Sequence, residues 1–164
     1  MRVSAKVDYA LRAMAQLAAQ GGGGPIKADH IARSQDIPHR FLLAILYELK
    51  HAHLVQSHRG AEGGYELSRP ASEITLAQIM RVVSGPLVDL RDLPLSDLGY
   101  EGAATALEDV WMAVRASVRS VLESVTLADV VAGQLPRAVR TLAATYRRES
   151  PARHAAVDAG APRG

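Results

Sequence analysis

The sequence predicts a mainly α-helical protein with a short β-hairpin in its N-terminal half and one long helix in its C-terminal half. Ala and Leu outnumber Ile, Phe and Thr, and aromatic residues make up only 4% of the chain, a composition that favours helices over extensive sheet. Apolar residues also recur at three- and four-residue spacing in segments separated by Gly and Pro. A chain of 164 residues holds one domain with an oligomerisation element, and it is too short for a large multidomain enzyme.

The sequence contains no run of eighteen apolar residues and no signal-peptide pattern at its start. We therefore expect a cytoplasmic protein without membrane contact. The chain has no cysteine, which excludes disulfides, cysteine-based zinc sites and cysteine-ligated iron–sulfur clusters. We expect no cofactor.

Charge is unevenly distributed along the chain, although the net charge is only +2. Residues 1–69 hold nine Lys or Arg against six Asp or Glu, residues 70–135 hold four against nine, and residues 136–164 hold six against two. A basic N-terminal part joined to an acidic middle part suits a DNA-binding domain attached to a self-associating element.

Three helices are expected before residue 52. The first runs from Ser4, a plausible N-cap, to Gln20, and Gly21–Gly24 ends it. The second covers Ala28–Ser34, and the third begins at Pro38 and runs to His51. Its expected buried stripe is Phe41, Leu42, Ile45, Leu46 and Leu49. A short helix, a tight turn and a longer helix form a helix-turn-helix.

A β-hairpin is expected directly after the third helix. Leu54–Ser57 and Tyr65–Ser68 are the predicted strands, and Gly60–Gly64 is the turn between them. A hairpin in this position is the wing of a winged helix-turn-helix, which we assign to residues 1–84 together with a helix from Ile74 to Val83 capped by Thr75.

Residues 85–102 are expected to be a linker or sensing segment, residues 103–148 a long helix and a C-terminal helix, and residues 149–164 a disordered tail. The long helix, from Ala103 to Glu123, would span roughly 30 Å, more than a small winged domain can bury. We therefore expect it to mediate homodimerisation through one apolar face. That face consists of Leu107, Val110, Trp111, Val114, Val118, Val121 and Leu122.

Residues in order along the chain resemble the Rrf-type winged-helix regulators of bacteria, the IscR/NsrR/CymR-like family. The matching positions are Met1–Ser4, Tyr9–Arg12, Ile31–Ala32, Ile37, Phe41–Leu42, Leu46, Leu49, Leu54–Val55, Arg59–Gly60, Gly63–Tyr65, Leu67, Ile74–Leu76, Gly85–Pro86 and Thr126–Asp129. The resemblance implies a transcriptional regulator, most simply a repressor, whose dimer symmetry matches a palindromic operator in double-stranded DNA.

The resemblance also implies which residues contact DNA. In such regulators the third helix lies in the major groove and the wing tip reaches the minor groove, where Arg59 suits a narrow A·T-rich segment. Leu43 and Ala44 stand where relatives often carry polar residues, so Leu43 would contact a thymine methyl or the protein would depend on DNA shape. The full expected set is Ser4, Lys6, Arg33, His39, Arg40, Leu43, Lys50, His58, Arg59 and Gly60.

The signal is left open by the sequence. Cluster-binding relatives place three cysteines in the segment that here carries Asp89, Asp92, Asp97 and Glu101, and Asp8, where some relatives supply a carboxylate ligand, has no cluster to complete. The alternatives are a small-molecule effector, a partner protein that carries the sensing function, or a metal held by histidines such as His51, His53 and His58. An enzyme is disfavoured because no catalytic triad spacing or phosphate-binding loop occurs.

Overall fold

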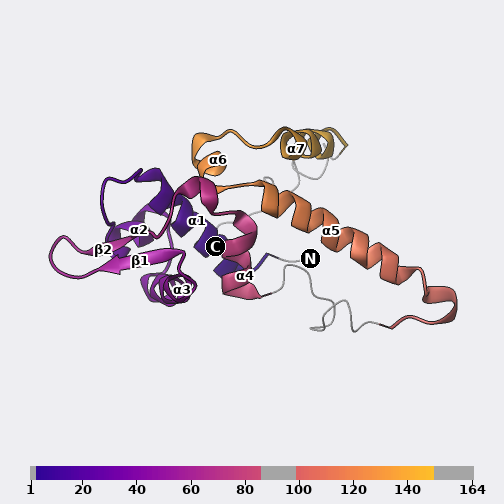
Figure 1. Cartoon of the computed structure of the whole chain (residues 1–164), viewed down its shortest axis with the longest axis horizontal. Helices are drawn as coiled ribbons and strands as arrows, with labels where there is room; N and C mark the ends of the chain where they lie inside the picture. Colours follow the sequence, from indigo (N-terminus) through magenta and orange to yellow (C-terminus); the bar gives the residue numbers. More distant parts are fainter. Residues whose placement is uncertain (1–2, 86–98, 150–164) are drawn as a thin grey trace, which may run out of the picture. The chain divides into compact units, whose positions relative to one another are not determined.

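The computed structural model describes residues 3–85 and 99–149 (Figure 1). The chain divides into two compact units, Met1–Gln134 and Leu135–Gly164. Most of the linker expected at 85–102 and nearly all of the tail expected at 149–164 lie outside the described residues. None of the described helices combines the length and apolar character needed to cross a bilayer.

Helix α1 (Ala5–Ala19) is the central helix of the first unit. Ser4 caps it as predicted, because its side chain accepts a hydrogen bond from the Val7 N–H at 3.3 Å. One face is buried along its whole length by Val7, Ala10, Ala13, Met14 and Leu17. Helices α3 (His39–His51), α4 (Leu76–Ser84) and α6 (Leu127–Ala132) all pack against α1.

The predicted helix-turn-helix is confirmed. Helix α2 (Ala28–Ser34) has the predicted bounds, and α3 begins one residue later than predicted because Pro38 is its N-cap residue. In the turn, Asp36 has a positive φ of 49° and the buried Ile37 donates its N–H to the Ala32 carbonyl at 2.9 Å. These two features fix the angle between the helices.

Four of the five residues expected in the buried stripe of α3 are in the core, and Phe41 is not. Its side chain is 50% exposed and makes an edge-to-face contact with Tyr9 of α1, with ring centroids 6.0 Å apart. Phe41 lies at the margin of the stripe, so it covers the start of α1 at the protein surface.

The wing is a two-stranded antiparallel sheet of β1 (Val55–His58) and β2 (Gly64–Leu67), in which Val55 is opposite Leu67 and His58 is opposite Gly64. The segment after the glycine run adds a further contact, because Ile26 and Tyr65 exchange two backbone hydrogen bonds of 2.8 Å. A Cβ atom on Gly64 would lie 2.4 Å from the Ile26 carbonyl oxygen. Glycine at this position therefore allows the close approach of the two backbones.

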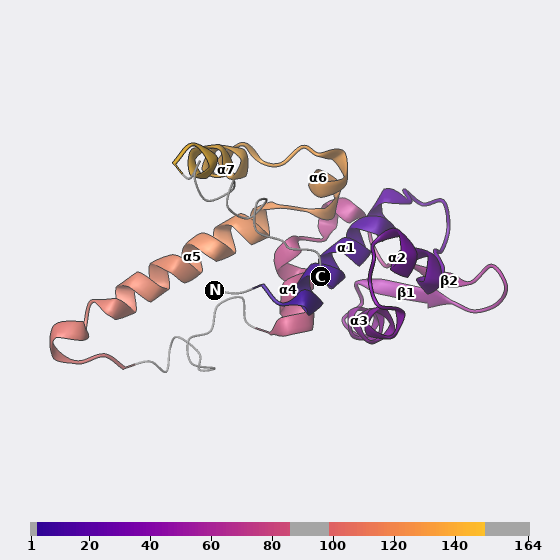
Figure 2. The same ribbon diagram turned by 180° about the vertical axis from the view of Figure 1, so that it is seen from behind.

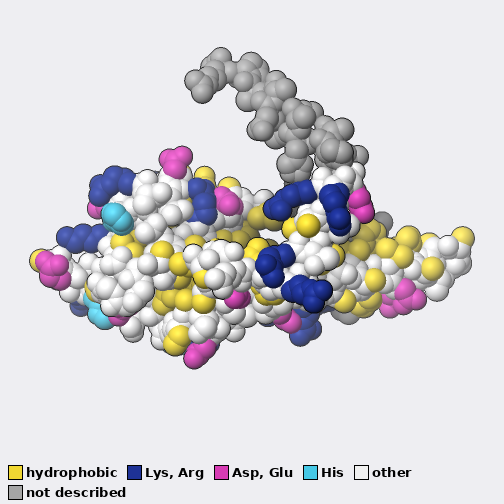
Figure 3. Space-filling model, turned by 90° about the horizontal axis from the view of Figure 1, so that it is seen from above, with side chains coloured by type: hydrophobic (Ala, Val, Ile, Leu, Met, Phe, Trp, Pro, Cys, Tyr) yellow, Lys and Arg dark blue, Asp and Glu magenta, His cyan; other side chains and the backbone are white. Residues whose placement is uncertain are grey.

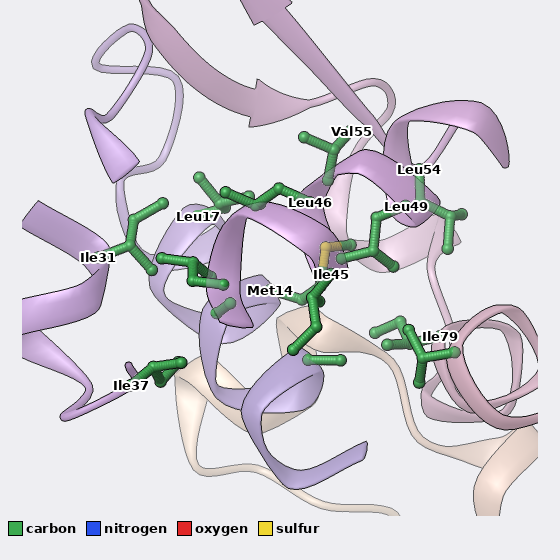
Figure 4. Packing of buried hydrophobic residues seen from close by; sticks show 14 of the residues in the cluster. Met14, Leu17, Ile31, Ile37, Ile45, Leu46, Leu49, Leu54, Val55 and Ile79 are labelled. Carbon is green, nitrogen blue, oxygen red and sulfur yellow. The ribbon is translucent and has the colours of Figure 1, made fainter. Parts of the chain in front are cut away.

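The core of the first unit is formed by side chains of α1, α2, α3, β1 and α4 (Figure 4). Met14 and Leu17 from α1 lie among Ile45, Leu46 and Leu49 of α3. Leu127 of α6 belongs to the same cluster. Part of the chain after the long helix therefore completes the core of the winged domain, which extends beyond the predicted limit at residue 84.

Helix α5 (Leu107–Ser124) contains no fully buried residue. It begins four residues later than predicted, since Gly102–Ala104 forms the short 3₁₀ helix η3 and Gly102 has a positive φ of 60°. The C-terminal end of α5 is joined to α4 by an ion pair between Glu123 and Arg81, and Leu122 packs against the core. In the second unit, α7 (Arg137–Glu149) corresponds to the C-terminal helix expected near the end of residues 103–148.

Candidate nucleic-acid interface

The exposed face of α3 is opposite its buried stripe. Arg40, Ala44, Tyr47 and His51 follow one another at three- and four-residue spacing, and Leu43 lies beside them. The Leu43 side chain is 40% exposed and Tyr47 is 64% exposed. Helix α3 and the hairpin lie at the same end of the winged domain in two opposite views (Figures 1 and 2), so one DNA duplex can meet both elements.

Tyr47 is a candidate contact that the sequence analysis did not include. Its ring lies against the His51 imidazole, with centroids 4.0 Å apart, and His51 Nδ1 is 2.8 Å from the Tyr47 carbonyl oxygen. Helical spacing could have predicted this contact, because Tyr47 is one turn after Leu43 and two turns after Arg40 on the same face of α3.

Two of the predicted DNA contacts, His39 and Lys50, lie on the flank of α3 and contact neighbouring elements. His39 Nε2 is 3.0 Å from the Asp29 carboxylate of α2, and Lys50 Nζ donates a 2.6 Å hydrogen bond to the Ser57 hydroxyl of β1. Both side chains therefore help to hold α3 in place relative to α2 and the wing. Both residues are exposed, so each can still approach a phosphate.

Ser4 and Lys6 also have partners within the protein. The Ser4 hydroxyl caps α1, and Lys6 Nζ is 2.8 Å from a carboxylate oxygen of Glu48 on α3. Lys6 keeps about one third of its side chain exposed, and a surface ion pair of this kind adds little stability. DNA contact by Lys6 would require it to leave Glu48 or to share its charge between two partners.

The wing tip is a tight turn that exposes Arg59. Gly60 has a φ of 100°, which a residue with a side chain rarely adopts. Next to the turn, His58 Nε2 is 2.6 Å from the Glu66 carboxylate, which also accepts a 2.8 Å hydrogen bond from Gln56. His58 is therefore held on the surface of the sheet, while Arg59 and Gly60 form the exposed tip.

Among residues 3–85 and 99–149, the predicted contacts Arg33, Arg40 and Arg59 have no acidic partner within 4 Å. All three are exposed. They lie on α2, at the start of α3 and at the wing tip respectively. The helix-turn-helix and the wing therefore carry three exposed positive charges that are unpaired among the described residues, and such charges favour contact with phosphate groups.

The apolar face of α5 provides a second surface. Leu107, Val110 and Val114 are 41%, 50% and 39% exposed, and Figure 3 shows hydrophobic side chains, in yellow, along this helix at the right. The other predicted members, Trp111, Val118, Val121 and Leu122, are half-buried. From Leu107 to Val121 the spacing alternates between four and three residues, as in a coiled-coil seam.

Histidine and carboxylate side chains are the residues that could hold the metal ion of a metal sensor. Asp8 forms a 2.9 Å ion pair with Arg12, and Asp89, Asp92 and Asp97 lie outside the described residues. Within the described ranges, no three His, Asp or Glu side chains gather closely enough to hold a metal ion. His51, His53 and His58 therefore do not form a three-ligand site together.

Comparison with known proteins identifies related regulators. A model of the Rrf2 family, described as iron-dependent transcriptional regulators, matches residues 3–133. The chain is 54% identical over 156 residues to the HTH-type transcriptional regulator Rv1287 of Mycobacterium tuberculosis, which covers 95% of this chain and 97% of that protein. It is 35% identical over 130 residues to the HTH-type transcriptional regulator CymR of Bacillus subtilis, covering 79% and 89%.

Solved structures give the same result. The structure of CymR, the global cysteine regulator of B. subtilis, superposes with a TM-score of 0.71 at 32% identity and covers 80% of this chain and 97% of that one. The structure of IscR from T. potens superposes with a TM-score of 0.68 at 34% identity, covering 81% and 88%.

Proposed function

The chain belongs to the Rrf2 family of transcriptional regulators, and from this premise we propose that it binds a palindromic operator as a homodimer and represses transcription by occluding it. The family confirms the expectation of a regulator in place of an enzyme. Each protomer places α3 in the major groove and the wing tip in the adjacent minor groove. The protein acts in the cytoplasm, where its DNA is.

The observation that carries this proposal is that α2, α3 and the wing each carry an exposed arginine without an acidic partner among the described residues. Arg33 and Arg40 are positioned to neutralise phosphates or, in the case of Arg40, to reach a base edge. Arg59 extends from a turn whose glycines permit close backbone approach to DNA, and a guanidinium is attracted by the negative potential of a narrow minor groove. The other proposed contacts are Ser4, Lys6, His39, Lys50, His58 and Gly60.

The middle of the exposed face of α3 is apolar, which indicates the kind of base contact that this helix makes. Leu43 and Ala44 offer no hydrogen-bonding side chain, and an exposed leucine next to an exposed tyrosine suits the C5-methyl groups of thymine in the major groove. Tyr47 can add one hydrogen bond through its hydroxyl. We therefore expect half-sites with thymines opposite the centre of α3 and discrimination that depends partly on DNA shape.

Dimerisation is assigned to the apolar face of α5. A partner helix that covers Leu107, Val110 and Val114 removes their apolar surface from water, which stabilises association by about 25 cal/mol for each Å² buried. The half-buried Trp111, Val118 and Val121 continue the same seam. A two-fold axis through this contact relates the two winged domains, as a palindromic operator requires.

Sensing by a cysteine-ligated iron–sulfur cluster does not fit this chain, although the family description is iron-dependent, because no cysteine is present. The alternatives that stay open are a small-molecule effector, a partner protein and a metal held by histidine and carboxylate side chains. An effector would act by changing the relative placement of the two winged domains, on which operator affinity depends.

An electrophoretic mobility shift with the protein's own upstream region tests the proposal. We expect a specific complex that survives competitor DNA, and a footprint with two protected half-sites one helical turn or a multiple of it apart. A footprint without dyad symmetry would contradict binding as a homodimer. Equal affinity for a duplex of scrambled sequence would contradict recognition of a specific operator.

A further inference from the structure

A small pocket lies at the base of the wing, away from the DNA-facing surface of α3. It has a volume of about 260 Å³ and is formed by the end of α1, the glycine run, β2 and the segment after β2. Leu17, Ile26, Leu67 and Pro70 supply apolar walls. The volume is below the range of roughly 300–1,000 Å³ typical of sites for drug-sized ligands, so a fitting ligand is small.

Arg69 gives this pocket its chemistry. Its side chain is half-buried, and its Nε atom is shielded from solvent without a hydrogen-bond partner in the described part of the chain. A shielded N–H without an acceptor is costly. Glu66, the one acidic residue among the described lining residues, is already bonded to His58 and Gln56, and Arg69 has no acidic partner within 4 Å in the described ranges.

Two glycines line the pocket beside Arg69. These are Gly22 and Gly24, and within residues 3–85 and 99–149 neither N–H has a backbone or side-chain acceptor. The two terminal Nη groups of the guanidinium form a pair of donors that matches the two oxygens of a carboxylate. The site therefore combines an anion-binding group with an apolar wall.

We propose that this pocket binds a small organic monocarboxylate with an aliphatic body, which pairs with Arg69 while its apolar part contacts Leu17, Ile26 and Leu67. Because β2 lines the pocket and Tyr65 is hydrogen-bonded to Ile26, an occupied pocket also restrains the wing. The effect on the wing rests on the proposed function, since it predicts a change in operator affinity. The binding of the carboxylate, the binding clause of the proposal, does not depend on DNA; the effect on operator affinity is its regulatory clause.

Thermal unfolding of the full chain tests the binding clause with acetate, butyrate, hexanoate and benzoate as probes. A ligand that binds only the folded state raises the midpoint with concentration. We expect a saturable rise with butyrate or hexanoate, none with hexanamide, and none in the Arg69→Gln variant. The Arg69→Lys variant keeps the charge but lacks the paired donors, so its response should be intermediate.

Two controls separate the outcomes. The Arg69→Met variant without ligand should be as stable as the wild type or more stable, because it removes a shielded donor; a large loss of stability would assign Arg69 a structural role and overturn the proposal. Equal shifts in wild type and Arg69→Gln, or no shift with any of the four carboxylates, would also overturn it. Operator affinity with and without hexanoate then tests only the regulatory clause.

Discussion

Thr75 and Thr126 lie opposite each other in an antiparallel bridge, and each caps its own helix. Thr75 accepts from the Gln78 N–H at 3.3 Å at the start of α4, and Thr126 accepts from the Asp129 N–H at 3.2 Å at the start of α6. The Leu76 N–H donates to the Val125 carbonyl and the Leu127 N–H donates to the Ile74 carbonyl. The Thr-Leu-Ala sequence at 75–77 and again at 126–128 is therefore repeated capping chemistry, and it also joins the chain after α5 to the winged domain.

Removing one of these caps should destabilise the whole first unit. Thr126→Ala deletes the acceptor for the Asp129 N–H and is expected to lower the free energy of unfolding by about 1 kcal/mol, measured by urea denaturation. Thr105→Ala is the matched control, because Thr105 is exposed and bonds only the Gly102 carbonyl within the described residues. Equal losses in the two variants would show that the α6 cap has no special role.

Stability should fall in acid because two carboxylates are stabilised in their charged forms. Hydrogen bonds from Arg81 and then Arg119 hold the pKa of Glu123 below its ordinary value, and hydrogen bonds from Thr126 lower the pKa of Asp129. A carboxylate whose pKa is lower in the folded state stabilises the fold at any pH above its unfolded-state pKa of about 4. This stabilisation is lost as the pH falls through the folded-state pKa.

The urea midpoint of the wild type should therefore decrease when the pH is lowered below about 4. Glu123→Gln should lower the midpoint at neutral pH and show a weaker decrease in acid. An identical pH dependence in the two proteins would mean that the Arg81–Glu123 contact does not stabilise the junction of α4 and α5.

The α5 face can be tested by introducing a charge into it. Val114→Glu should convert the dimer to a monomer in analytical ultracentrifugation, because an unpaired carboxylate would be buried in an apolar seam. Ala116→Glu adds the same charge on the opposite side of α5 and should leave the dimer intact. If Val114→Glu sediments like the wild type, α5 does not form the interface.

Thymine methyl groups should contribute to recognition if the apolar face of α3 reads them. Replacing thymine by deoxyuridine in the footprinted half-sites removes only the methyl group, and we expect a severalfold loss of affinity. The loss should be smaller in Leu43→Ala, which lacks the contacting side chain. Equal affinity for both duplexes would favour recognition through DNA shape.

Features set by local chemistry were predicted from the sequence. The predicted caps at Ser4 and Thr75 agree with the structure, because each side chain lies within three residues of the backbone group it bonds, although α4 begins at Leu76 and not at Ile74 as expected. Four of the five core positions expected in α3 were also found, because helical periodicity assigns residues to a face.

Features that depend on distant parts of the chain were not predicted. Helical periodicity predicts the face of α3 on which Phe41 lies but not how deeply its side chain is buried, which depends on its contact with Tyr9 on α1. The Lys6–Glu48 and His39–Asp29 pairs join different elements and so occupy residues that the sequence alone marked as DNA contacts. The bridge between Ile26 and Tyr65, and the pocket beside it, arise from close contact between two backbone segments. Gly64 permits this contact, but a glycine in the sequence does not predict it.

The most direct test of the central claim is the operator affinity of Arg59→Ala, measured by fluorescence anisotropy at two salt concentrations. Arg147→Ala, which removes the same charge from α7, is the control. We expect a loss of about 1–3 kcal/mol, or about 5- to 150-fold in affinity, for Arg59→Ala, with near wild-type affinity for Arg147→Ala. Wild-type affinity in Arg59→Ala at both salt concentrations would contradict insertion of the wing into the minor groove.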